Sequence, residues 1–199
     1  KDSHKTLPVI EHDMDHIMKF ELVPFKRAID AGVASVMSAH ISYPKILGDS
    51  EPATFSSKFM TDILRDKLEF NGIVMTDDLE MAAASEKLPL DKAAVKAIKA
   101  GVDIVLATSA SGSVDKIFNG IKNAVKTGEI SEERINQSLR RILSAKYKYG
   151  LFTYNHDSNG SNNIEISDSD QRDVLRADII NADVTRKALF YNKARHDIE

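Results

Sequence analysis

The chain has 199 residues, 42% of them hydrophobic and 29% charged, and a formal net charge of −3. This is an ordinary composition for a soluble protein, and the length allows one domain with a substantial core. Lys and Arg are spread along the chain, which argues against nucleic acid as the main partner. No apolar run is long enough to span a bilayer, and the N-terminus does not resemble a signal peptide. The absence of cysteine excludes disulfides and thiolate metal sites but leaves the compartment open.

Helices that lead into short apolar strands recur along the first three quarters of the chain. Amphipathic spacing and glycine stops predict helices over 14–32, 56–70, 90–101, 114–128 and 131–150, and strands over 33–39, 72–76 and 102–108. Thr54 or Ser56 is the expected N-cap of the second helix, and Ser131 that of the last one. Apolar strands without alternation, covered by such helices, indicate a parallel sheet. A (β/α)8 barrel and a doubly wound sheet both fit, although no glycine-rich nucleotide-binding loop follows any strand.

The composition changes after Phe152. Residues 153–167 are rich in Asn, Asp, Ser and Gly, which predicts a linker or surface loop. Residues 168–199 contain a helix pattern followed by a short strand-like run. Three strands are too few to close a barrel, so the chain forms either a small open sheet or part of a longer polypeptide.

Residues capable of chemistry follow the strands. In parallel α/β folds, sites gather at the carboxyl ends of strands, and these ends deliver His40, the Asp77–Asp78 pair and Ser109. His40 either lines a pocket there or is a hydrogen-bonded histidine near the core. The N-terminal loop adds Asp2 and His4, which form either a solvated loop or a dyad in which Asp2 orients His4 for proton transfer.

The acidic run after the second strand, "TDDLEM", has three interpretations. Asp77 or Asp78 can cap a short helix, where a carboxylate meets unpaired amides. Asp77, Asp78 and Glu80 can together bind magnesium. One aspartate can be a catalytic carboxylate. By pattern alone, Glu80 is a solvated helix residue and Met81 a packing residue.

Several blocks in chain order resemble glycoside hydrolase family 3, most closely its bacterial β-N-acetylglucosaminidases that act on cell-wall fragments. The blocks span about residues 2–152 and read "DSHKTLPVIEHD", "ELVPFKRAIDAGVASVMSAHISYP", "PATFSSKFMTDILRDKLEFNGIVMTDDLEM" and "AIKAGVDIVLAT". The resemblance implies an α/β fold that is the C-terminal half of a TIM-type (β/α)8 barrel, with a linker and the start of a second α/β domain. The expected bounds are 1–152 for the half-barrel, 153–167 for the linker or loop, and 168–199 for the helix and lead-in.

The resemblance also implies roles for individual residues. Asp77 would be the nucleophile of a retaining glycosidase, His4 the general acid/base, and Asp2 the residue that orients His4. His40 and Met81 are the candidate substrate-binding residues. No metal or other cofactor is expected. The implied substrates are muropeptides that contain N-acetylglucosamine, and both an envelope or extracellular and a cytoplasmic location stay open.

The chain also departs from the family pattern. The sugar-binding "KHFPGHG" block that precedes the dyad in family members is not in this sequence, nor are the strands of the first half of the barrel. The expected partner is therefore the remaining N-terminal part of the barrel, with no nucleic acid and no membrane span. The alternatives are a β-glucosidase of the same family and a non-catalytic sugar-binding fragment.

Overall fold

The structure is a computed structural model that describes residues 6–85, 88–108, 112–156 and 162–166. Its centre is a parallel sheet in the order β1-β2-β3, formed by Ser35–Met37, Ile73–Asp78 and Ile104–Leu106. The register pairs Val36 with Val74 and Met75 with Ile104. The predicted α/β fold with parallel strands is confirmed.

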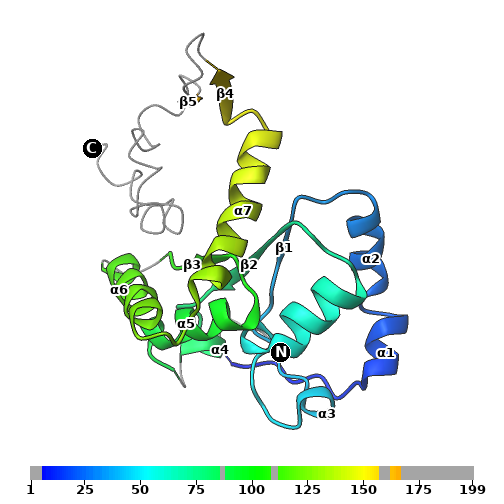
Figure 1. Cartoon of the computed structure of the whole chain (residues 1–199). Helices are drawn as coiled ribbons and strands as arrows, with labels where there is room; N and C mark the ends of the chain where they lie inside the picture. Colours follow the sequence, from blue (N-terminus) through cyan, green and yellow to red (C-terminus); the bar gives the residue numbers. More distant parts are fainter. Residues whose placement is uncertain (1–5, 86–87, 109–111, 157–161, 167–199) are drawn as a thin grey trace, which may run out of the picture.

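Helices precede and follow each strand of the sheet (Figure 1). In Figure 1, α1 and α2 lie on the β1 side of the sheet, whereas α6 lies beside α5 on the opposite side. The helical elements are α1 (Met14–Lys19), α2 (Val23–Asp30), α3 (Pro44–Leu47), η1 (Ala53–Phe55), η2 (Lys58–Lys67, a π-helical segment), α4 (Ala82–Ser85), α5 (Leu90–Ala100), α6 (Ser113–Lys126) and α7 (Glu132–Lys148).

One hydrophobic core lies between the sheet and these helices. The inward residues predicted for the second helix, Phe59, Ile63 and Leu64, are all buried in it. Helix α5 contacts the core through a face made mostly of alanine, which lets it lie close to the strands. Full burial of a side chain such as Ile63 or Ile98 contributes about 1.5–3 kcal/mol to folding. Ser131 caps α7 as predicted, because its hydroxyl accepts the Arg134 amide hydrogen at 3.2 Å.

The single helix predicted over 14–32 is wrong. The chain instead forms α1 and α2, with a break between Lys19 and Val23. Pro24 explains the break, because it has no amide hydrogen and its ring would clash with the carbonyl of Phe20, one turn earlier. Proline at the start of a helix is well tolerated, and Pro24 lies in the first turn of α2.

The structure differs from the sequence-based expectation in two further places. The expected linker or loop over 153–167 contains an antiparallel hairpin, β4 (Phe152–His156) paired with β5 (Asn162–Ile166). The expected cap of the second helix is also wrong, since Ser57 is the residue at that position and makes no side-chain cap. Residues 168–199 lie outside the described residues.

A buried aspartate joins the sheet to two helices. Asp103 has no exposed surface and stands immediately before β3. One of its carboxylate oxygens, Oδ2, accepts the Val74 amide hydrogen of β2 at 3.0 Å and an Arg65 hydrogen from η2 at 2.6 Å. The other, Oδ1, accepts hydrogens from Ser138 at 2.7 Å and Arg141 at 3.1 Å, both on α7. Asp103 therefore fixes the positions of β2, β3, η2 and α7 relative to one another.

The arginines around Asp103 also bind backbone carbonyls. Arg65 donates to the carbonyls of Phe70 and Gly72 at 2.8 and 2.6 Å, just before β2 begins. Arg134 donates to the Val102 carbonyl at 2.7 Å, just before β3. Burial lowers the pKa of Arg65 to about 10, while the neighbouring Asp103 opposes this shift, so the guanidinium stays charged at neutral pH. The charges are thus paired and hydrogen-bonded, which a buried ion cluster requires.

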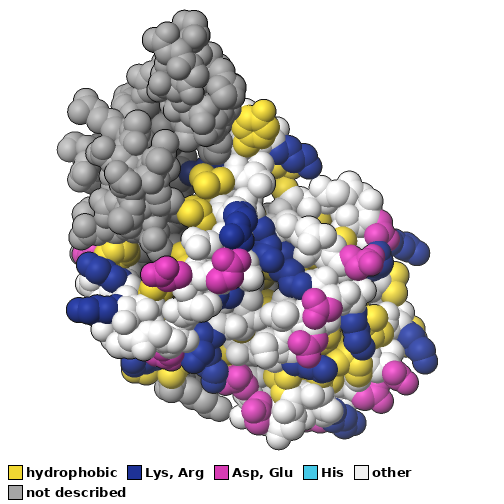
Figure 2. Space-filling model, viewed as in Figure 1, with side chains coloured by type: hydrophobic (Ala, Val, Ile, Leu, Met, Phe, Trp, Pro, Cys, Tyr) yellow, Lys and Arg dark blue, Asp and Glu magenta, His cyan; other side chains and the backbone are white. Residues whose placement is uncertain are grey.

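The surface carries charges of both signs. On the face drawn in Figure 2, Lys and Arg side chains alternate with Asp and Glu and form no broad patch of one sign. Among the described helices, none has the length and apolar character needed to cross a membrane.

We predict that Asp103→Asn lowers the free energy of unfolding of residues 1–199 by about 3–5 kcal/mol, because it leaves buried guanidinium charges without their carboxylate. Urea unfolding followed by circular dichroism measures this change. The matched control is Asp62→Asn, which breaks the exposed pair between Asp62 and Lys58 and should cost about 0.5 kcal/mol or less. Equal effects of the two substitutions would contradict the role given to Asp103.

Candidate active site

A β-bulge shapes the carboxyl end of β2. The pairing with β3 shifts between Met75 and Asp78, so that Thr76 and Asp77 together face the single residue Val105. The Thr76 hydroxyl accepts the Leu106 amide hydrogen at 2.9 Å and so replaces a backbone acceptor at the irregularity. Bulges bend a strand and change the direction of its side chains, and they are frequent next to active sites. This bulge sets the direction of Asp77.

The two aspartates after the bulge make different contacts. Asp77 is half-buried, and its Oδ1 accepts the Asp78 amide hydrogen at 2.8 Å. Asp78 closes the following turn, because its Oδ1 accepts the Glu80 amide hydrogen at 2.9 Å and its Oδ2 accepts the Thr108 hydroxyl. Asp78 therefore acts as a turn-stabilising residue, whereas the other oxygen of Asp77, Oδ2, is the carboxylate atom suited to contact a ligand.

His40 is fully buried beside this turn. Its Nε2 donates to the Asp78 carbonyl at 3.1 Å, and its Nδ1 lies 3.0 Å from the Thr54 hydroxyl. A carbonyl only accepts, so Nε2 carries a hydrogen, and Nδ1 of the neutral ring accepts from Thr54. The Ser38 hydroxyl lies 3.0 Å from the Thr54 hydroxyl and donates to it, which completes a chain of hydrogen bonds from Ser38 to His40. Three side chains thus hold the backbone next to Asp77.

The protonation of His40 follows from its surroundings. Burial lowers the pKa of His40, and the Asp78 carbonyl and the nearby Asp77 carboxylate oppose this shift. The neutral ring is the form that fits the hydrogen-bond chain, since a protonated Nδ1 would compete with the Thr54 hydrogen.

A cavity of about 370 Å³ lies in front of Asp77. The N-terminal segment forms one wall of it, because Ile10 donates to the Ser42 carbonyl at 2.9 Å and Ser42 donates to the Pro8 carbonyl at 2.9 Å. The described residues that line the cavity are Pro8, Val9, Ile10, Ala39, His40, Ile41 and Asp77. The carboxyl ends of β1 and β2 and residues 8–10 thus line the same cavity.

The structure brings together some of the predicted site residues. Asp77 and His40 share the cavity, and His40 combines both predicted roles, since it lines the hollow and is also a hydrogen-bonded buried histidine. Met81 is half-buried in the turn after β2 and is not among the cavity-lining residues. Asp2 and His4, the proposed dyad, lie outside the described residues, as does Ser109.

Sequence reasoning missed the partners of His40. Thr54 was expected as a helix cap, but its hydroxyl is used by His40 and Ser38. Glu80 was expected as a solvated helix residue, but it precedes α4 and accepts the Ser113 hydroxyl at 2.6 Å. The carboxylates of Asp77, Asp78 and Glu80 each accept a hydrogen bond from a different group. They are therefore not arranged around a common point, which argues against the magnesium interpretation of this acidic run.

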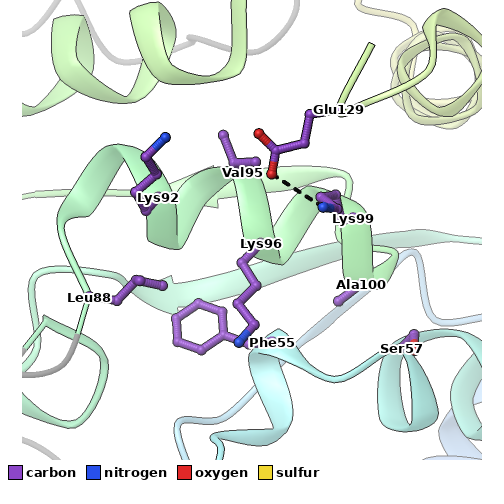
Figure 3. A pocket seen from close by; sticks show the side chains of 9 residues that line it. All are labelled: Phe55, Ser57, Leu88, Lys92, Val95, Lys96, Lys99, Ala100 and Glu129. Atoms are coloured by element: carbon purple, nitrogen blue, oxygen red, sulfur yellow. Dashed lines mark hydrogen bonds and ion pairs between the residues drawn. The ribbon is translucent and has the colours of Figure 1, made fainter. Parts of the chain in front are cut away.

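A second cavity, of about 490 Å³, lies beside helix α5 and is drawn in Figure 3. Its walls come mainly from α5 and from the region of η1 and η2. Two of its lysines form ion pairs, Lys96 with Glu51 and Lys99 with Glu129. Although larger, it lies away from the carboxyl ends of the strands and has no carboxylate placed as Asp77 is, so the smaller cavity is the candidate active site.

Comparison with known proteins identifies a family and several relatives of this chain. Residues 1–145 match the family described as "Glycosyl hydrolase family 3 N terminal domain". A Beta-hexosaminidase of Methylobacillus flagellatus is 36% identical over 121 residues, which is 61% of this chain and 34% of that protein. A Beta-N-acetylglucosaminidase/beta-glucosidase of Cellulomonas fimi is 33% identical over 138 residues, which is 65% of this chain and 24% of that protein.

Among solved structures, a glycoside hydrolase family 3 beta-N-acetylglucosaminidase from Paenibacillus sp. str. FPU-7 superposes with a TM-score of 0.73 at 34% identity. The superposition covers 85% of this chain and 32% of that one. The chain thus spans from about a quarter to about a third of the length of these relatives.

We predict that stability falls as the pH is lowered below about 6.5, the ordinary pKa of an unfolded histidine, because the unfolded chain then binds a proton that folded His40 resists. The loss continues down to the lowered pKa of folded His40. In His40→Gln, which keeps a donor for the Asp78 carbonyl but does not titrate, urea unfolding between pH 7 and 5 should show a shallower pH dependence. Thr54→Ser keeps the hydroxyl and should retain the original slope. Parallel slopes for the original chain and His40→Gln would overturn this account.

Proposed function

The chain belongs to glycoside hydrolase family 3, and we propose that it is the catalytic part of a retaining hydrolase that releases terminal β-linked N-acetylglucosamine from muropeptide-like cell-wall fragments. The observation that carries this proposal is the position of Asp77. It stands in a bulge at the carboxyl end of a parallel strand and faces a cavity whose other wall is the N-terminal segment. The names of the relatives support the choice of sugar.

In the first step of the proposed reaction, the Oδ2 atom of Asp77 attacks the anomeric carbon. A carbon–oxygen bond to Asp77 forms while the glycosidic bond breaks, and the leaving oxygen takes a proton. In the second step, water attacks the same carbon and releases Asp77 as a carboxylate. The hydrogen bond from the Asp78 amide to Asp77 Oδ1 supports this division of roles between the two oxygens. The reaction needs no metal or other cofactor.

We assign the proton transfers to His4. In the first step His4 gives its proton to the leaving oxygen, and in the second step it takes one from water. Asp2 would hold the ring in the tautomer that this role requires. Pro8, on the cavity wall, supports the assignment, because it is four positions after His4 and this separation spans at most about 14 Å of chain.

Two further residues are proposed to shape the sugar site. His40 would act as part of the cavity wall and through its hold on the Asp78 carbonyl, since both ring nitrogens bind protein groups. Met81 lies in the turn that follows Asp78 and would contact the substrate only at the edge of the site.

We also propose that the chain is the C-terminal half of a TIM-type barrel that packs against an N-terminal half. Strand β1 is an edge of the described sheet, and α2 beside it has no buried residue. Phe20, Phe25 and Met37 come from the end of α1, from α2 and from β1, and they expose 63%, 43% and 49% of their surface, which offers apolar area for such a contact. On this proposal, 1–152 is the half-barrel, 153–167 the connection and 168–199 the lead-in to a second domain.

A β-glucosidase activity is the second candidate, because the relative from Cellulomonas fimi carries both names. Hydrolysis of an aryl β-glucoside and an aryl β-N-acetylglucosaminide at equal concentrations separates the two. The proposal requires a higher kcat/KM for the N-acetylglucosaminide.

We predict that Asp77→Ala in the full-length gene product abolishes hydrolysis of an aryl β-N-acetylglucosaminide, because no carboxylate remains to form the intermediate. Asp78→Asn is the control, since it changes the turn and leaves Asp77 in place, and it should retain measurable activity. An inactive Asp78→Asn together with an active Asp77→Ala would show that the assignment is wrong.

We further predict that residues 1–199 alone do not hydrolyse this substrate, because the described cavity is walled by only two strand ends and one segment. The full-length gene product is the comparison, assayed at equal molar concentration, with circular dichroism to verify folding of the shorter chain. Comparable turnover by residues 1–199 would contradict the half-barrel proposal without affecting the role of Asp77.

A further inference from the structure

A cluster of two histidines and a glutamate surrounds helix α1. His12 precedes the helix, His16 lies within it, and Glu21 follows its end. The Nδ1 atom of His12 lies 2.5 Å from Glu21 Oε1, and the Nδ1 atom of His16 lies 3.1 Å from Glu21 Oε2. The two imidazole rings are 3.8 Å apart between centroids. One carboxylate is therefore held between two imidazoles, and the three groups converge on one point.

The helix beneath this cluster is well anchored. Asp13 caps α1 by accepting the His16 amide hydrogen at 2.9 Å, and Ile17 is buried in the core with 1% of its surface exposed. The Phe20 ring packs against His16 at 4.7 Å between ring centroids. The backbone thus holds the three side chains near one another.

The spacing of the ligand atoms suits a tetrahedral metal ion. Two ligand atoms that each lie about 2.0–2.1 Å from Zn²⁺ are about 3.3 Å apart. The two histidine–carboxylate distances, 2.5 and 3.1 Å, are within 1 Å of this value, and the three ligand atoms all lie within 4.8 Å of one another. Small side-chain rotations therefore make room for an ion between them.

The chemistry of the ligands selects the class of ion. A carboxylate only accepts, so each Nδ1 that contacts Glu21 carries a hydrogen, and a metal ion would replace both hydrogens. Imidazole nitrogens favour Zn²⁺ and similar transition metals, whereas Mg²⁺ and Ca²⁺ prefer sites made of oxygen atoms.

We propose that His12, His16 and Glu21 form a binding site for Zn²⁺ or a similar divalent transition-metal ion, with water completing the coordination. The side chains are 46%, 41% and 31% exposed, so the ion exchanges with solvent. None of the three lines the cavity beside Asp77. The site is therefore separate from the hydrolytic chemistry, and it does not depend on the proposed function.

The test is a Zn²⁺ titration of residues 1–199 against a colorimetric chelator, with Mg²⁺ in parallel. We expect one equivalent of Zn²⁺ to bind and Mg²⁺ not to compete. His16→Ala and Glu21→Gln should each weaken binding by about tenfold or more. His156→Ala, which removes a histidine elsewhere in the chain, should leave the affinity unchanged. No Zn²⁺ binding, or equal affinity in the original chain and both ligand variants, would refute the site.

A second measurement uses the unsubstituted chain, in case a variant fails to fold. Addition of Zn²⁺ should shift the Nδ1 resonances of His12 and His16 in ¹⁵N spectra of the histidine rings and leave those of His40 unchanged. Lowering the pH to about 5.5 should release the ion, because protonated imidazole does not bind metal. Shifts confined to other histidines would place the ion elsewhere and contradict the proposal.

Discussion

The fold depends on the carboxylate of Asp103. It takes the place of a backbone carbonyl for the Val74 amide and binds side chains from η2 and α7 at the same time. Since it is fully buried, its charge is tolerated only because arginines surround it, and the arginines in turn require the carboxylate. In addition to the packing of apolar side chains, this network fixes the register of β2 against β3 at one point.

The stabilising contact and the candidate catalytic residue lie at opposite ends of β2 and β3. Asp103 lies at the amino end of β3, beside the start of β2, and Asp77 lies at the carboxyl end of β2. With the register fixed at the amino end, the extra residue in β2 has to be accommodated near the carboxyl end, where the bulge places Asp77. The hydrogen bonds that link Ser38, Thr54 and His40 then hold the Asp78 carbonyl, which follows Asp77. This separation of stabilising and functional ends is typical of folds built on parallel strands.

Sequence patterns predicted the local features of this structure well. The order of helices and parallel strands, the inward residues of η2 and the cap at Ser131 all follow from periodicity and short-range rules. The break before α2 also had a local signal in Pro24, which the apolar periodicity concealed. The hairpin in 153–167 had no such signal, because Asn- and Ser-rich segments favour turns whether or not their flanks pair.

The features that sequence patterns missed depend on contacts between distant residues. Arg65 and Asp103 are 38 positions apart, and Thr54 and His40 are 14 apart, so no spacing rule connects them. The bulge at Asp77 likewise depends on where β3 pairs, which the sequence of β2 does not encode. The choice of Asp77 over Asp78 came from the family resemblance and stays a prediction, whereas the contacts of Asp78 with Thr108 and the Glu80 amide were not predictable from the sequence.

The central claim is that Asp77 forms a covalent bond to the sugar, and trapping that bond tests it most directly. The full-length gene product would be incubated with a fluorinated N-acetylglucosaminyl fluoride, whose electron-withdrawing ring substituent slows release of the intermediate, and then digested and analysed by mass spectrometry. The account predicts a glycosyl adduct on Asp77 that disappears as the enzyme regains activity. An adduct on Asp78 or another residue, or turnover of the reagent without any adduct, would contradict it.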